Sequence, residues 1–215
     1  MAFDVSPPRD CGACPRLAVY RAANRSAYPD WSNAPVESFG GARARLLVVG
    51  LAPGLRGANR TGRPFTGDYA GDLLYHTLIR FGFASGAYDR RADDGLELVD
   101  CAIVNAVRCA PPQNKPTPAE IAACRAYLSR SIAALANLKV VLALGRVAHD
   151  TLLRAFGARA GEFPFAHGAR HRLKAAGPNL FDSYHCSRYN TNTGVLTEAM
   201  FHDVFASIRA DLDRA

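Results

Sequence analysis

The chain has 215 residues, of which 49% are hydrophobic and 21% are charged. This length and composition are typical of one globular domain and exclude a disordered or fibrous chain. The N-terminal residues contain no apolar signal core, and no apolar run approaches membrane-spanning length, so we expect a cytoplasmic protein with no membrane partner. The net charge of +7 and the pI near 9.3 favour a polyanionic partner such as nucleic acid.

The first segment, residues 1–41, is expected to be an irregular arm, because prolines interrupt it repeatedly and leave room for one or two helical turns over residues 17–24. The apolar run at residues 46–49 predicts a buried strand that ends at Gly50. A polar loop rich in glycine and proline then continues to Asp68, and its composition allows the backbone to approach a ligand closely.

Strand and helix patterns alternate through the rest of the chain. Thr117 and Glu120 have the spacing of a capping box, with proline at the first helical position between them. Helices are predicted over residues 72–81, 118–137, 146–156 and 194–212, and strands over residues 99–107, 140–144 and 180–184. This alternation predicts a single α/β domain, a three-layer αβα sandwich with a mostly parallel central four-stranded sheet. Residues 157–178 are basic and rich in glycine and have no clear pattern. Within them, the basic segment 167–174 is interpreted either as a phosphate-contacting surface or as a solvated loop.

Polar loops follow several of the predicted strands. Residues 50–68 follow the first strand, residues 185–192 follow the last, and Asn105 lies near the end of the second. The carboxyl ends of parallel strands meet at one edge of a sheet, where α/β proteins usually bind their ligands. A histidine such as His185 can donate to an anion that develops on a leaving group, although it could also cap an element; Asn105 could equally be structural.

Four of the six cysteines are spaced as possible metal ligands: Cys11, Cys14, Cys109 and Cys124. Four thiolates can hold a zinc ion or a four-iron cluster, and spacing alone does not separate the two. Alternatively, Cys109 and Cys124 are buried apolar residues. Cys101 falls inside a strand and is expected in the core, whereas the pattern assigns no role to Cys186.

Several motifs together resemble the uracil-DNA glycosylase superfamily. They are residues 50–54 (GLAPG), residues 62–68 (GRPFTGD), Asn105, the four spaced cysteines and residues 185–190 (HCSRYN). The resemblance extends from Cys11 to the last helix and is strongest to family 5, the type B enzymes that contain an iron–sulfur cluster. It implies one αβα domain whose N-terminal arm is held by a 4Fe-4S cluster on the four cysteines.

The resemblance also implies roles for the polar loops. Asp68 would stabilise a cationic sugar and activate water, His185 would bond the departing base, Asn105 would read the base edge and Phe65 would stack on it. Because Leu51 stands where the related family 4 has an acidic residue, water would be placed by Asp68 and by the backbone of the adjacent residues. The expected substrate contacts are Gly50, Leu51, Ala52, Phe65, Arg188, Tyr189 and Asn190, the last three in a loop that enters the duplex.

The expected activity is excision of uracil and of other deaminated or damaged bases, such as hypoxanthine and ethenocytosine, from double-stranded and also single-stranded DNA by a monomeric enzyme. A competing hypothesis is a non-catalytic DNA-binding protein with a structural site of four cysteines. A third, a phosphate-cradling nucleotide hydrolase, is disfavoured because no Lys-Ser or Lys-Thr pair closes the glycine-rich loop.

Overall fold

The computed structural model describes residues 5–173 and 177–214. Within them, six strands form one sheet in the order β1-β5-β2-β6-β8-β7. The inner four strands are parallel, and each edge strand pairs antiparallel with its neighbour. The strands are β1 (Phe39–Gly40), β2 (Leu46–Gly50), β5 (Cys101–Asn105), β6 (Val140–Leu144), β7 (Arg170–Arg172) and β8 (Asn179–Ser183). A separate two-stranded pair joins β3 (Ala84–Ser85) to β4 (Glu97–Leu98).

The four parallel strands confirm the sheet that the sequence predicts. All residues of β2, β5 and β6 are buried, as expected for strands covered on both faces. The two edge strands were not predicted from the sequence. β1 has only two residues, and β7 is Arg-His-Arg, which carries no apolar signal; both are specified by pairing with a buried neighbour.

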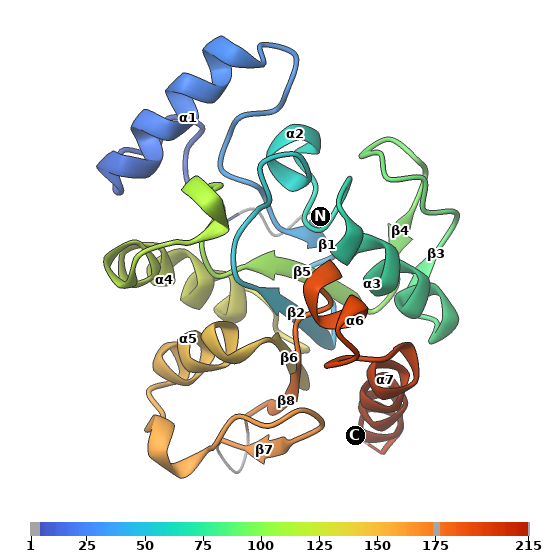
Figure 1. Cartoon of the computed structure of the whole chain (residues 1–215). Helices are drawn as coiled ribbons and strands as arrows, with labels where there is room; N and C mark the ends of the chain where they lie inside the picture. The colour runs from blue at the N-terminus through green and yellow to red at the C-terminus, as the bar shows by residue number, and fades with distance from the viewer. Residues whose placement is uncertain (1–4, 174–176, 215) are drawn as a thin grey trace.

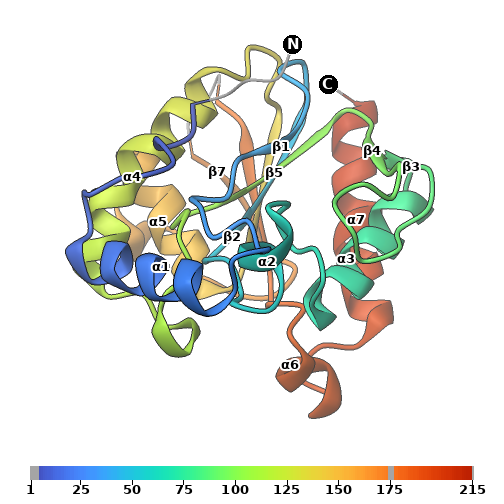
Figure 2. The same ribbon diagram turned by 90° about the horizontal axis from the view of Figure 1, so that it is seen from above.

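Two pairs of helices cover the two faces of the sheet. On one face α3 (Tyr69–Arg80) and α7 (Glu198–Asp213) pack on the apolar side chains of the strands. On the other face lie α4 (Pro118–Ala133) and α5 (Arg146–Phe156). Figure 1 shows the sheet in the centre of the molecule, and Figure 2 shows the two helical layers on either side of it. The predicted three-layer sandwich is therefore confirmed.

The helix boundaries follow the capping residues. The capping box of Thr117 and Glu120 is formed at the start of α4. Asp68 caps α3, which consequently begins at Tyr69, earlier than the apolar spacing predicts. The side chain of Thr197 accepts a hydrogen bond from the Met200 N–H, so α7 begins at Glu198, later than predicted.

The N-terminal arm is more helical than expected. Pro15 begins α1 (Pro15–Ala27), a helix of 13 residues, because proline is favoured at the first helical position. The Arg16 guanidinium binds the Glu120 carboxylate at 2.8 and 2.7 Å and so attaches α1 to α4. Short helical segments also occur in the loops, namely α2 (Ala58–Thr61), α6 (Arg188–Asn192), η1 (Pro112–Asn114) and η2 (Ala160–Glu162). No helix among the described residues is long and apolar enough to cross a membrane.

Side chains of residues 157–173 contact residues elsewhere in the chain. Arg170 forms an ion pair with Asp211, and His171 Nε2 lies 3.1 Å from Asp182 Oδ2. His167 Nδ1 accepts a hydrogen bond from the Tyr184 N–H at 3.1 Å. These side chains hold β7 and β8 against the rest of the domain. Lys174, which belongs to the basic segment 167–174, lies outside the described residues.

A buried ion pair joins α5 to β8. His149 Nδ1 lies 2.7 Å from Asp182 Oδ1, and both side chains are almost fully buried. His149 Nε2 lies 2.9 Å from the Phe163 carbonyl oxygen, so both ring nitrogens face acceptors. Burial disfavours the charged imidazole, but the hydrogen bond and the charge of Asp182, together with the Phe163 carbonyl, outweigh this effect and raise the pKa of His149.

We predict that this pair makes stability depend on pH. A raised histidine pKa adds stability that is fully present below about pH 6.5 and is lost as pH rises through the folded-state value. The free energy of unfolding, measured with urea, should therefore fall as pH rises above about 6.5, by about 1.4 kcal/mol for each unit of pKa difference.

The variant His149→Gln should lose this part of the pH dependence. His76→Gln is the matched control, because His76 is exposed on α3. Equal pH dependence in the wild type and in His149→Gln would contradict the assignment.

Candidate active site

The predicted site residues meet at the carboxyl edge of the parallel sheet. Gly50, the last residue of β2, pairs with Asn105, the last residue of β5. β8, separated from β2 by β6, ends at the same edge at Ser183, whose carbonyl accepts a hydrogen bond from the Gly145 N–H at 2.8 Å. The chain then leads directly to His185. The loops after β2 and β8 therefore emerge on the same edge, as the sequence predicts.

The absence of a side chain at Gly50 allows two others to approach each other. A Cβ atom there would lie 2.4 Å from Phe65 Cζ and 2.6 Å from Asn105 Oδ1. Both distances are shorter than any ordinary contact. The glycine is therefore required by the close packing of an aromatic ring and an amide over the end of β2.

Asn105 is a buried polar residue at the end of β5. Its relative exposure is 3%, and its side-chain amide forms no hydrogen bond with any of the residues that the structure describes. Buried polar groups are almost always hydrogen-bonded, so an amide left free at a sheet edge indicates a ligand position. An asparagine side chain offers both a donor and an acceptor, which suits the edge of a nucleobase.

Phe65 and His185 face each other across this position. Their ring centroids are 6.0 Å apart and the ring planes differ by 29°. Burial lowers the pKa of His185 to about 4, so the imidazole is neutral at neutral pH. A neutral imidazole can donate one hydrogen bond to an oxygen that becomes negatively charged.

Asp68 lies at the start of α3, where its carboxylate accepts a hydrogen bond from the Gly71 N–H at 3.2 Å. Burial raises the pKa of Asp68, while the hydrogen bonds from the Gly71 and Ala70 N–H groups oppose this shift. The second carboxylate oxygen faces the backbone after β2. A Cβ atom at Gly57 would lie 2.4 Å from it, and one at Gly54 would lie 3.1 Å from it. The glycines of the loop thus make room for the acid.

Leu51 and Ala52 connect this site to the cysteines. The Leu51 carbonyl accepts a hydrogen bond from the Val107 N–H at 2.9 Å, which continues the pairing of β2 and β5 beyond Gly50. The side chains of Leu51 and Ala52 pack with a small apolar cluster that contains Leu17 and Cys124. Leu51 is therefore part of the packing between two candidate sites.

The segment after His185 forms the short helix α6. Asn190 Nδ2 donates a hydrogen bond to the His185 carbonyl oxygen at 2.8 Å, so Asn190 holds the backbone of the histidine. Arg188 lies over the ring of Tyr69, 5.2 Å from its centroid. Tyr189 is 73% exposed and is the large side chain that α6 presents to solvent.

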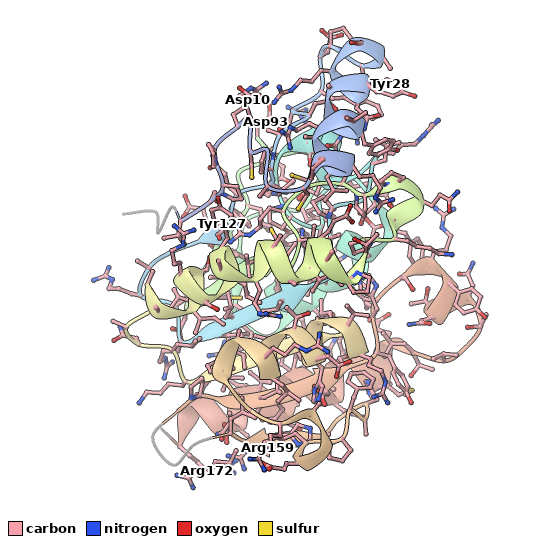
Figure 3. All side chains as sticks on the ribbon, turned by 90° about the vertical axis from the view of Figure 1, so that its left-hand side faces the viewer. Asp10, Tyr28, Asp93, Tyr127, Arg159 and Arg172 are labelled. Atoms are coloured by element: carbon pink, nitrogen blue, oxygen red, sulfur yellow. The ribbon has the colours of Figure 1, made fainter. Side chains whose placement is uncertain are left out.

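The four spaced cysteines surround one cavity between α1, α4 and the loop after β5. Its lining includes Cys11, Cys14, Cys109 and Cys124. Tyr127 also lines the cavity and is labelled in Figure 3, which looks onto α1 and α4. Hence the structure brings together four residues that lie far apart in the sequence, from Cys11 to Cys124.

Hydrogen-bond donors approach these sulfur atoms. The Arg21 guanidinium lies 3.3 Å from Cys109 Sγ, and the Arg108 N–H lies 3.4 Å from Cys124 Sγ. Burial and the neighbouring thiols raise the pKa of Cys109, and the hydrogen bond and charge of Arg21 oppose this. Donors of this kind stabilise thiolates, the form in which cysteine binds metals.

The other two cysteines lie away from this cavity. Cys101 is buried at the start of β5, as predicted. Cys186, to which the sequence pattern assigns no role, is fully buried between His185 and α6. Burial raises its pKa, and the charge of Asp68 adds to the effect, so Cys186 is a neutral thiol beside the candidate site.

The profile of the uracil DNA glycosylase superfamily matches residues 37–209 of this chain. This range includes both strand-end loops and most of the sheet. The chain therefore belongs to the uracil-DNA glycosylase superfamily.

Its relatives indicate which group of the superfamily the chain belongs to. A type-5 uracil-DNA glycosylase of Thermus thermophilus is 46% identical over 200 residues, which cover 90% of each chain. The type-5 enzyme of Pyrobaculum aerophilum is 39% identical over 94% of this chain and 89% of its own. By contrast, a type-4 enzyme of the same organism is 31% identical over 79% of this chain and 72% of its own. The chain is accordingly a member of the type-5 group.

The sequence does not indicate that Tyr88 and Asn190 support the site from outside, since it singles out Asn190 only as a substrate contact. Tyr88, in the segment between β3 and β4, bonds the backbone beside Phe65, and Asn190 bonds the backbone of His185. Neither belongs to a pattern whose spacing reports the contact. Tyr88 in particular is 23 residues from Phe65 and lies in a polar loop.

We predict that Gly50→Ala destabilises the protein. The new methyl group would overlap Phe65 and Asn105, and overpacking of this kind costs about 1–3 kcal/mol. Gly41→Ala is the matched control, because a Cβ atom at Gly41 meets nothing within 4 Å. The urea concentration at the midpoint of unfolding should be lower than that of the wild type for Gly50→Ala and unchanged for Gly41→Ala. Similar midpoints for the two variants would show that the end of β2 is less tightly packed than described.

Proposed function

We propose that the protein is a monofunctional DNA glycosylase that takes uracil out of the base stack and hydrolyses its N-glycosidic bond with water, leaving an abasic site. The observation that supports this most directly is the buried amide of Asn105, unpartnered among the described residues and next to the rings of Phe65 and His185. An aromatic face, an amide and a neutral imidazole at one position suit a planar base with polar edges.

Cleavage of an N-glycosidic bond makes the sugar cationic while the base departs as an anion. An enzyme accelerates this step by binding the separated charges more strongly than it binds the substrate. It therefore needs a negative group near the sugar, a donor near the base oxygen and a pocket that excludes water from the base. The residues at the sheet edge can meet each of these needs.

Asp68 is the negative group in this proposal. Its carboxylate would stabilise the cationic sugar and would orient or deprotonate the attacking water. Because Leu51 has no polar side chain, no second acid follows β2 directly to take this role. The raised pKa of Asp68 also suits a residue that accepts a proton during the reaction.

His185 would donate a hydrogen bond to the pyrimidine oxygen as negative charge develops there. Its lowered pKa means that this donor is a neutral imidazole, which needs no proton from solvent at neutral pH. Asn105 would bind the base edge and Phe65 would stack on its face. Gly50, Leu51 and Ala52 would line the pocket with backbone, close to the attacking water.

The helix α6 is proposed to enter the DNA duplex. Tyr189 is exposed at its surface, and inserted side chains can occupy the gap that a flipped nucleotide leaves. Arg188, held over Tyr69, would contact a phosphate. Asn190 would act with them by holding His185 in place, and its contact with the His185 carbonyl supports this role.

The proposed substrates include uracil in double-stranded DNA, uracil in single-stranded DNA, and the damaged bases hypoxanthine and ethenocytosine. The support for this breadth is the resemblance to the type-5 enzymes, which implies a broad set of substrates. We further propose that the enzyme acts as a monomer in the cytoplasm, where its DNA substrate lies.

A base-release assay tests the function and the residue roles together. Wild-type protein should produce alkali-labile abasic sites in duplexes that contain uracil, hypoxanthine or ethenocytosine. Asp68→Ala should lower the excision rate by about two to three orders of magnitude and His185→Ala by about a hundredfold, with DNA affinity little changed.

Asp203→Ala is the matched control, because this acid is exposed on α7 away from the sheet edge. Normal turnover in both site variants would refute the roles assigned to them. DNA binding by the wild type without any base release would favour a non-catalytic DNA-binding protein.

We also propose that Cys11, Cys14, Cys109 and Cys124 hold a 4Fe-4S cluster. All four cysteines line one cavity, and hydrogen-bond donors from Arg21 and Arg108 approach two of their sulfur atoms. Four thiolates can hold a zinc ion or a four-iron cluster, and the resemblance to the type-5 enzymes favours the cluster. When bound, the cluster would hold α1 and the arm against α4.

Metal analysis distinguishes the two possibilities. Protein purified without oxygen should be brown and should contain about four iron atoms per chain. Cys109→Ser should lose iron and melt at a lower temperature, whereas Cys101→Ala, at the opposite end of β5, should retain it. A colourless wild type with one zinc ion per chain would refute the cluster.

A further inference from the structure

The segment between β3 and β4 closes over the turn that carries Phe65. Arg63, just before this turn, binds the Asp94 carboxylate with two hydrogen bonds of 2.7 and 2.8 Å. Both side chains are buried. Burial opposes ionisation, but the hydrogen bonds and charge of Arg63, together with the N–H groups of Asp89 and Leu96, hold the pKa of Asp94 well below its usual range. This paired contact fixes the beginning of the turn to residues 86–96.

Aromatic rings surround the same arginine. Its guanidinium carbon lies 5.1 Å from the ring centroid of Phe39, 5.3 Å from that of Tyr75 and 5.8 Å from that of Tyr88. These rings and the carboxylate hold the Arg63 side chain on several sides. The ring of Tyr88 is therefore held by packing that does not depend on its hydroxyl group.

The Tyr88 hydroxyl group makes a second set of contacts. It donates to the Phe65 carbonyl oxygen at 3.2 Å and accepts from the Gly67 N–H at 3.3 Å. Phe65 has a φ of +53°, a backbone conformation that residues other than glycine rarely adopt. Such a backbone persists only where its surroundings hold it, and the hydroxyl group bonds to it on both sides of Thr66.

The first turn of α3 limits movement on the opposite side. A Cβ atom at Gly71 would lie 1.8 Å from the Phe65 carbonyl oxygen and 2.4 Å from Tyr88 Oη. The turn that carries Phe65 therefore packs directly against the backbone of α3 at Gly71. Together, Tyr88 and Gly71 define where the Phe65 carbonyl lies and consequently how its ring is directed.

We propose that Tyr88 is a positioning residue for base excision. Its hydroxyl group holds the backbone of Phe65 so that the ring stays next to His185 and parallel to the extracted base. This inference rests on the proposed stacking role of Phe65. A displacement of about 1 Å in a group that positions substrate can cost about a hundredfold in rate, so a loosened Phe65 should be detectable.

The variant Tyr88→Phe tests this inference, because it removes the hydroxyl group and keeps the ring over Arg63. Its single-turnover rate of uracil excision at saturating enzyme should fall about tenfold, since a loosened ring is less well aligned. The enzyme concentration that gives half the maximal rate should change less than the rate does. The melting temperature should remain within a few degrees of the wild-type value.

Tyr28→Phe is the matched control. Its ring stacks on Trp31 with centroids 4.0 Å apart, at the end of α1 (Figure 3), and the substitution should not alter the excision rate. An equal loss in Tyr28→Phe and Tyr88→Phe would overturn the proposal.

A double-mutant cycle with Phe65→Ala separates positioning from general stability. If Tyr88 acts through the Phe65 ring, Tyr88→Phe should change the rate less than twofold once that ring is absent, because coupled residues are not additive. A full additional loss in the double variant would overturn the proposal, as would a normal rate in Tyr88→Phe alone. A normal rate in Phe65→Ala alone would instead refute the stacking role, and with it this inference.

Discussion

The arrangement of the candidate site depends on one close approach at the end of β2. Gly50 pairs with Asn105 in parallel register, and neither Phe65 nor the Asn105 amide could take its position if residue 50 carried a side chain. The parallel register brings the ends of β2, β5 and β8 to the same edge, and the bare glycine lets an aromatic ring cross that edge. The pocket is thus a consequence of strand pairing, and the loops that complete it are held by contacts of their own.

Those contacts come from different parts of the chain. The Phe65 turn is held by residues between β3 and β4, whereas the His185 backbone is held by Asn190 of α6. On the third side, Leu51 and Ala52 pack towards the four cysteines and α1. A cluster bound there would stiffen the backbone that follows β2. The proposed chemistry does not use a metal, so this stiffening is a physical reason for a metal centre next to the site. Each part of the site can therefore be disturbed separately.

Burial acts on both proposed catalytic groups but has different consequences for them. It raises the pKa of Asp68 and lowers that of His185, because it disfavours the charged form of each. For the histidine the result is a neutral donor, which can respond to charge developing on a base. For Asp68, backbone N–H groups at the start of α3 oppose the shift and favour the carboxylate. The N-terminus of α3 thus supports a negative group at a largely buried position.

The sequence by itself determined the parallel core, most of the helices and the set of residues at the sheet edge. Apolar runs, the Thr117 capping box and the order of strands and helices are local signals, and they were sufficient for those predictions. Only the tertiary structure revealed the edge strands β1 and β7, the full length of α1, and the roles of Tyr88 and Asn190 as supports. It also brought the four cysteines around one cavity. These features depend on contacts between residues far apart in the chain. β7 carries no apolar pattern, and a tyrosine in a polar loop gives no local sign that its hydroxyl group reaches the backbone of Phe65. Hydrogen bonds of this kind arise only when separate elements pack together.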